Sequence, residues 1–183
     1  KTPVNILAQA LEQVPDFKEA YDCFLQRVTI NESSNSMITN YSRSISAVAL
    51  YFRRPPHLLT IEEINAFLYE MKVNCTYTSA IFKMTIYALR YWFRLFGMNE
   101  KATAMPAIRQ ESKLPVVLSK RECKELFLAP KTLKHRYLLA FAYGSGLRMN
   151  ELRLLKIADV DTDRKQIHVR AGKGRKDRYV VLA

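Results

Sequence analysis

Cysteine and long hydrophobic runs are both scarce in this chain, and each shortage excludes a class of protein. The three cysteines, Cys23, Cys75 and Cys123, lie far apart and form no CxxC pair, so we expect reduced thiols rather than a zinc site, a disulfide framework or a catalytic thiol. No stretch approaches the roughly 20 apolar residues of a membrane helix. The first residues, KTPVNILAQALEQ, lack the features of a secretory signal, so we expect a cytoplasmic protein.

Acidic residues are also in short supply. The chain has 29 Lys and Arg against 17 Asp and Glu, a net charge of +12 at pH 7. Residues 113–183 hold 17 basic and 7 acidic side chains, whereas residues 1–112 hold 12 and 10. A segment this basic favours a polyanionic partner. Because the cations are spread over several elements instead of one amphipathic helix, we expect a nucleic acid as the partner and no membrane.

The first part of the chain, residues 1–98, has the periodicity of a helical domain. We expect four helices, over about residues 16–30, 34–54, 60–71 and 78–96. Thr60 and Glu63 form a capping box that opens the third helix. Pro55 and Pro56 end the second, because proline lacks the amide hydrogen and restricts the residue before it.

The predicted helix over residues 78–96 carries two neighbouring stripes. Its apolar side chains repeat at steps of three and four, so one face can pack in a core. One position later, Lys83, Tyr87, Arg90 and Arg94 follow the same spacing, about 100° around the helix. Together with Arg43 of the second helix, they are our candidates for DNA contacts. For any one of these residues, a solvated charged face is the alternative.

The stretch MNEKATAMPAIRQESKLP is typical of an interdomain linker, which we place at residues 99–114. The second domain, residues 115–183, opens with the capping box of Ser119 and Glu122 and continues in helices to about residue 128, over 132–143, and from residue 147 or 148 onward. It ends on two strand-like runs, QIHVR and RYVVLA, joined by the turn AGKGRKD. We therefore expect a mainly α fold with a small β component.

The first motif that carries chemistry is GSGLRMNEL, residues 144–152. The glycines permit a sharp turn, and Arg148 falls in the first turn of the next helix, where amide groups favour a phosphate. Glu151 lies on the same face and can orient the guanidinium group, which offers two parallel donors to a phosphate. The alternative is an ordinary surface Arg–Glu pair after a tight turn.

The second motif is the basic turn GKGRKDR, residues 172–178. Lys173 stands between two glycines, so its ammonium group can reach into a groove and donate a proton to a leaving alkoxide. Arg175, Lys176 and Arg178 are further candidates for DNA contacts. A turn that only touches phosphates is the commoner use of such a sequence.

Taken in order, LPVVLS, AYGSGLRMNELRLLKIADVD and AGKGRKDRYVVL closely resemble the tyrosine recombinases, the phage-integrase family. The resemblance covers residues 114–183, and more loosely the preceding helices, which resemble the family's SAM-like core-binding domain. It implies a DNA-binding domain at residues 1–98 and the N-terminal portion of a catalytic domain at 115–183. It also implies a site-specific recombinase or integrase that binds double-stranded DNA and assembles on it as a tetramer.

Three catalytic roles follow from the resemblance. Arg148 matches the arginine that neutralises the scissile phosphate, Glu151 the acidic residue that braces the site, and Lys173 the general acid for the leaving 5′-hydroxyl. The family cuts DNA without metal or another cofactor, through a 3′-phosphotyrosine intermediate. Oriented cations then provide the electrostatic stabilisation that Mg²⁺ provides elsewhere.

Some parts of the family pattern have no counterpart here. The later His-x-x-Arg box and the nucleophilic tyrosine are missing, and His168 and Arg170 have the wrong spacing for that box. Tyr179 lies inside a predicted strand, so we do not assign it as the nucleophile. We therefore expect a DNA-binding but catalytically incomplete fragment, the alternative being a non-catalytic DNA-binding or regulatory protein on the same scaffold.

A calcium loop is excluded by the sequence itself. Asp159, Asp161 and Asp163 give the opening D-x-D-x-D pattern, but Arg164 and Arg170 stand where the loop needs Gly and Glu. We expect no metal site, and expect these aspartates to shape a turn.

Overall fold

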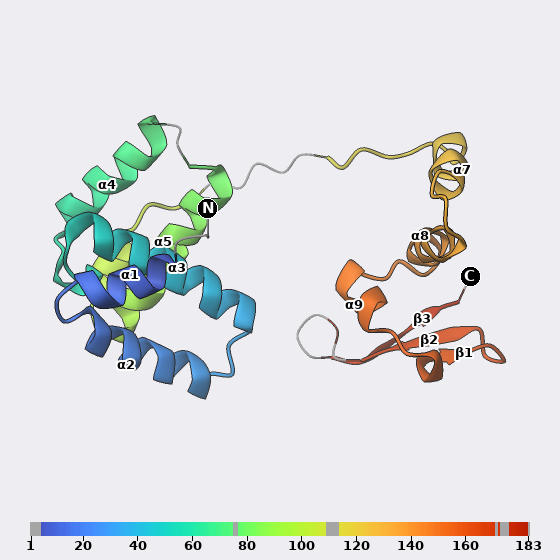
Figure 1. Ribbon diagram of the computed structural model, residues 1–183, viewed down its shortest axis with the longest axis horizontal. Coiled ribbons are helices and arrows are strands. Elements are labelled where there is room, and N and C mark those ends of the chain that lie inside the picture. Colours follow the sequence, from blue (N-terminus) through green and yellow to red (C-terminus); the bar gives the residue numbers. More distant parts are fainter. Residues whose placement is uncertain (1–4, 75–76, 109–113, 171, 173–175, 183) are drawn as a thin grey trace. The chain divides into compact units, whose positions relative to one another are not determined.

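The computed structural model describes residues 5–74, 77–108, 114–170, 172 and 176–182 (Figure 1). The chain divides into two compact units, a helical unit of residues 1–111 and a C-terminal unit of residues 112–183. The mainly α fold with a small β component is confirmed. No helix in the described part of the chain is long and apolar enough to cross a membrane.

The helical unit contains every helix that we expected in residues 1–98. Its elements are α1 (Ile6–Gln13), α2 (Phe17–Ile30), α3 (Asn35–Phe52), the 3-10 turn η1 (Pro56–Leu58), α4 (Ile61–Val73), α5 (Ser79–Leu95) and α6 (Asn99–Ala104). The capping box of Thr60 and Glu63 opens α4 as predicted, and the Ser34 side chain caps α3. Asp16 precedes α2, but its backbone is left-handed and its side chain makes no capping hydrogen bond.

Helix α5 carries the centre of this unit's core. Trp92 is fully buried, with its ring centroid 6.1 Å from that of Phe17 and 5.8 Å from that of Phe24. Tyr21 and Ser42 share a buried hydrogen bond of 2.8 Å between α2 and α3. Ile86, Leu89 and Phe93 of the predicted apolar stripe are also fully buried, so this stripe is part of the packing face and fixes the orientation of the neighbouring stripe.

Residues 99–105, which we placed in the linker, belong to the helical unit. Asn99–Ala104 form α6, which packs against α5, and both Ala102 and the C-cap residue Met105 are buried. Lys101 donates hydrogen bonds to the carbonyl oxygens of His57 (3.2 Å) and Leu59 (2.8 Å) and so ties α6 to η1. Six residues are too few to give the helical periodicity on which the prediction rested. The short α1 was not predicted for the same reason.

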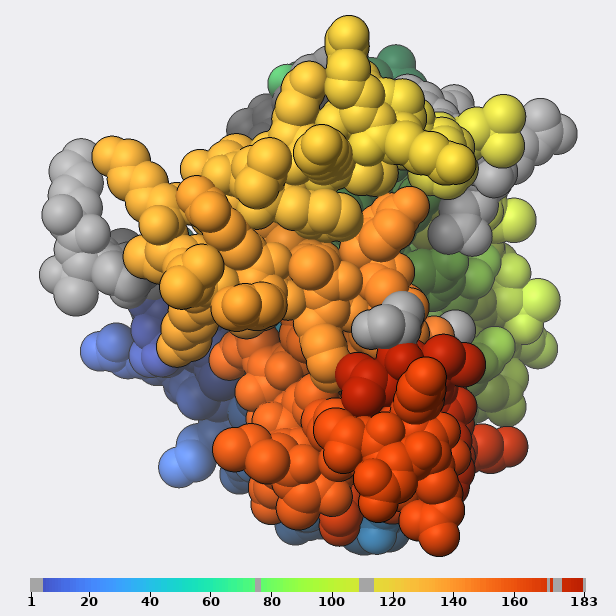
Figure 2. All heavy atoms as spheres, turned by 90° about the vertical axis from the view of Figure 1, so that its right-hand side faces the viewer, coloured from blue at the N-terminus to red at the C-terminus, as the bar shows by residue number. Residues whose placement is uncertain are grey.

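The C-terminal unit places three helices beside a small sheet (Figure 1). Its elements are α7 (Lys120–Leu128), α8 (Leu133–Ser145), α9 (Met149–Leu154), the 3-10 turn η2 (Ile157–Asp159), β1 (Val160–Asp161), β2 (Gln166–Val169) and β3 (Arg178–Val181). Helices α7 and α8 pack side by side, as Figure 2 shows in yellow and orange. The predicted capping box of Ser119 and Glu122 opens α7.

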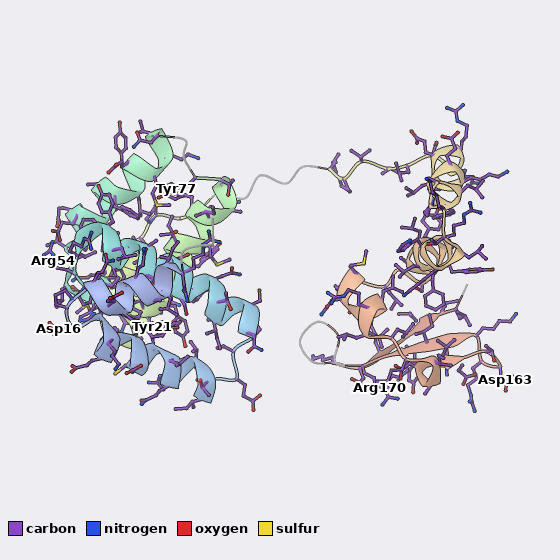
Figure 3. The ribbon with its side chains drawn as sticks, viewed as in Figure 1. Asp16, Tyr21, Arg54, Tyr77, Asp163 and Arg170 are labelled. Carbon is purple, nitrogen blue, oxygen red and sulfur yellow. The ribbon has the colours of Figure 1, made fainter. Side chains whose placement is uncertain are left out.

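The sheet is antiparallel, in the order β1-β2-β3. The strands β2 and β3 are the two that we predicted, whereas β1 has only two residues and was not expected. Asp163 lies at one end of the sheet, in the turn before β2, and Arg170 lies at the other end (Figure 3). Ile167 and Val169 are buried against Leu147 and form this unit's core.

Candidate DNA-binding and catalytic site

The basic stripe of the helical unit lies on α5, beside the face that packs. Tyr87 and Arg94 are exposed and Lys83 is half-buried. The Tyr87 phenol is close enough to Tyr41 to contribute, after burial and Tyr91, to raising the pKa of the Tyr41 hydroxyl. The stripe therefore presents one phenol, Tyr87, among its cations, a combination suited to a phosphate backbone.

Arg90, the middle cation of this stripe, is held inside the helical unit. Its Nη2 atom donates to the carbonyl oxygens of Met105 and Pro106, each at 3.0 Å. Arg90 thus fixes the segment that follows α6, a role that the sequence pattern did not reveal, and its predicted contact with DNA is untested.

Arg43 is exposed on α3, at a groove that Tyr77 and Ile81 also line. Tyr77 stands at the beginning of α5 (Figure 3). The groove is mainly apolar, so Arg43 adds a single cation at its edge. Its suggested contact with DNA remains a prediction.

In the C-terminal unit, Gly146 makes the turn that precedes α9. Its φ is +62°, a left-handed conformation that glycine adopts without steric cost. Arg148 follows as the N-cap residue, one position before the helix instead of within its first turn. Its backbone N–H donates to Glu151 Oε2 (2.9 Å) and its Nη1 donates to Glu151 Oε1 (3.0 Å). One carboxylate thus holds both the backbone and the guanidinium group of Arg148.

Arg178 is the second arginine on this carboxylate. Its Nη1 and Nη2 atoms donate to Oε1 (2.8 Å) and Oε2 (2.7 Å) of Glu151, a bidentate pair. The side chains of Arg148, Glu151 and Arg178 are 57%, 10% and 34% exposed. Hydrogen bonds from Arg178 and then from the Arg148 backbone lower the pKa of Glu151 to about 2. The carboxylate is ionised, and two guanidinium groups surround it.

The basic turn is described only in part. Lys173 and Arg175 lie outside the described residues, so their predicted roles are untested. Lys176 is exposed, and its carbonyl oxygen accepts a 3.0 Å hydrogen bond from the Gly172 amide at the base of the turn.

The aspartates before β2 make local turns, as expected. Asp159 accepts from the Lys156 amide (3.0 Å) and from Arg170 Nε (2.7 Å). Asp161 accepts from the Arg164 amide (2.8 Å). The pairing of Asp159 with Arg170 was not predicted, although the sequence shows that Arg170 ends the strand-like run QIHVR.

The geometry of this cluster suits an anionic ligand. The exposed guanidinium group of Arg148, fixed by the nearly buried carboxylate of Glu151, can neutralise a phosphate without a metal ion. A phosphate-binding site is therefore the class of site that these residues favour.

Comparisons with known proteins agree with that class. Residues 116–183 match the model of the phage integrase family. The chain is 32% identical over 155 residues to a putative integrase/recombinase of Sinorhizobium fredii, covering 84% of this chain and 50% of that protein. It is 37% identical over 118 residues to the tyrosine recombinase XerA of Thermococcus kodakarensis, covering 63% of this chain and 42% of that protein.

A crystal structure of XerA recombinase aligns with a TM-score of 0.45 and 27% identity, over 92% of this chain and 60% of that one. The chain spans about half the length of the curated relatives that it matches, or less. It belongs to the phage integrase family, the tyrosine recombinases.

Proposed function

We propose that the intact protein is a site-specific DNA recombinase of the tyrosine type and that this chain supplies its DNA-binding helices and part of its catalytic site. The observation that carries the proposal is the Arg148 guanidinium group, exposed for a phosphate yet fixed by a nearly buried Glu151. Related proteins are recombinases and integrases by name, which supports the same activity.

In the proposed reaction, a tyrosine oxygen attacks the scissile phosphorus and the bond to the 5′-oxygen breaks. Arg148 stabilises the charge on the non-bridging oxygens, and Lys173 gives its proton to the leaving 5′-oxygen. The product is a 3′-phosphotyrosyl link. Rejoining is the reverse reaction, in which a new 5′-hydroxyl attacks the phosphorus, loses its proton and releases the tyrosine. Neither the nucleophilic tyrosine nor the His-x-x-Arg box is found in this sequence, so we propose that the chain alone is inactive.

The proposal assigns double-stranded DNA as the partner of both units. In the helical unit Arg43, Lys83, Tyr87 and Arg94 are the proposed contacts, and Lys176 is one in the C-terminal unit. For the intact protein we propose a tetrameric synapse on DNA. The domain assignment remains a helical DNA-binding domain, a linker and the N-terminal portion of a catalytic domain, with α6 now counted in the first.

The test is Arg148→Lys in the full-length protein. We expect its affinity for duplex DNA to stay within about threefold, while formation of the covalent protein–DNA complex slows by about 100-fold or more, because the bidentate geometry matters most in the transition state. The measurement is single-turnover trapping of the complex on a nicked duplex. Arg153→Lys, an exposed arginine on α9, is the matched control and should react normally.

Near-normal cleavage by Arg148→Lys would contradict the catalytic assignment. If the unmodified full-length protein binds DNA but never becomes covalently attached, the alternative function, a non-catalytic DNA-binding or regulatory protein, replaces this one.

A further inference from the structure

The register of the sheet turns Arg178 inward. Arg178 pairs with Val169 across the sheet and Val180 pairs with Ile167, and both partners are buried core residues. Because side chains alternate along a strand, Arg178 and Val180 share the face that packs on the helices, while Tyr179 faces the other way. An arginine on the packed face of a sheet needs a partner there, since its charge is otherwise desolvated without compensation.

That partner is Glu151, and it is shared. Arg178 occupies both carboxylate oxygens in bidentate fashion, and the same two oxygens receive the amide and the guanidinium group of Arg148. Strand β3 is therefore joined through one carboxylate to the beginning of α9. The rigid fork of Arg178 leaves the carboxylate a single orientation, and that orientation sets where Arg148 Nη1 lies.

Gly172 stands against this cluster. A Cβ atom at Gly172 would lie 2.6 Å from Arg178 Nη1 and 3.3 Å from Glu151 Oε1. The first distance is shorter than any van der Waals contact, so a side chain at Gly172 must displace the Arg178 guanidinium group. The Gly172 amide is meanwhile engaged with the Lys176 carbonyl oxygen, which restricts the backbone from moving away.

We propose that Arg178 is a positioning residue: it orients Glu151, and through Glu151 it holds Arg148 in place for the scissile phosphate, with Gly172 needed to leave room for it. The catalytic half of this inference rests on the proposed recombinase function, whereas the positioning half does not. It replaces our expectation from the sequence that Arg178 contacts DNA.

The first test needs no activity. In this chain, Arg178→Gln should speed amide hydrogen exchange at Arg148 by about tenfold or more, because the carboxylate that accepts this N–H is no longer held. The matched control is Arg164→Gln, which removes an arginine from an exposed pair with Asp161 on the same sheet. It should leave exchange at Arg148 unchanged. Unchanged exchange in Arg178→Gln would overturn the proposal.

The second test uses the full-length protein. Arg178→Lys keeps the charge but loses the fork, so we expect covalent-complex formation to slow by about tenfold or more while duplex affinity and its salt dependence stay unchanged. Gly172→Ala should slow the reaction similarly. In an Arg178→Ala background, Gly172→Ala should cost less than about threefold, because the clash is gone.

The opposite pattern identifies a phosphate contact. In that case Arg178→Gln would weaken binding and reduce the salt slope by about one, and Gly172→Ala would react normally, which overturns the proposal. If the unmodified protein does not cleave DNA at all, the proposed function fails. The exchange experiment still decides whether Arg178 positions Arg148.

Discussion

The basic stripe on α5 can be tested by its contribution to the salt dependence of DNA binding. We select Lys83 and Arg94 because Arg90 is already bound to two carbonyl oxygens of its own unit. Each phosphate contact contributes about 0.9 to the slope of log affinity against log salt. The double variant Lys83→Gln, Arg94→Gln should therefore have a slope shallower by about 1.8, which corresponds to roughly 60-fold weaker binding at 0.1 M salt.

The control is the double variant Lys18→Gln, Arg27→Gln. Both residues are exposed on α2, a different helix from the one that carries the stripe, and their loss changes the net charge by the same amount. Fluorescence anisotropy of a labelled duplex between about 50 and 200 mM salt gives both slopes. If the two double variants have the same slope and affinity, the stripe acts only through net charge, and the assignment of Lys83 and Arg94 as phosphate contacts is wrong.

Three further predictions concern other parts of the molecule. Lys173→Ala in the full-length protein should cleave normal DNA very slowly, and its cleavage rate should be largely restored when sulfur replaces the bridging 5′-oxygen, because a thiolate leaving group needs no acid. Equal rescue of Arg148→Ala by the same substrate would refute this division of roles. Glu151 has a pKa lowered to about 2 from its usual 4.5, so its stabilising effect is complete above pH 4.5 and is lost as the pH falls towards 2. The difference in Tm between the unmodified chain and Glu151→Gln should shrink over that range, and a constant difference would contradict it. Lys101→Met should lower the free energy of unfolding of the helical unit by about 2 kcal/mol, measured in urea, because it loses two hydrogen bonds from a charged donor, whereas Lys18→Met should have no effect.

Much of the fold could be predicted from local signals. The capping boxes at Thr60 and Ser119 mark helix starts because their side chains satisfy backbone amides within four residues, so no distant contact is needed. The helix α6 could not be predicted in that way, because Ala102 and Lys101 are held by α5 and η1 instead of by the helix itself.

The site was only partly predictable for a related reason. The spacing of Arg148 and Glu151 gave their contact, which lies within one helical turn. The proposed role of Arg178 depends on a contact between β3 and Glu151 of α9. These residues are 27 positions apart in the chain, so no local pattern shows the contact. The alternation in RYVV did contain a signal, since it places Arg178 on the same face as Val180, but the basic composition of the turn suggested DNA instead.

The docking of α6 also decides where the helical unit can be separated from the rest of the chain. Ala102 and Met105 are part of its hydrophobic core, and Lys101 holds the carbonyl oxygens of His57 and Leu59. A fragment that stops at residue 98 loses these three side chains and uncovers apolar surface on the remaining helices. The sequence pattern places the domain boundary at residue 98, whereas the packing requires a fragment that extends beyond Met105.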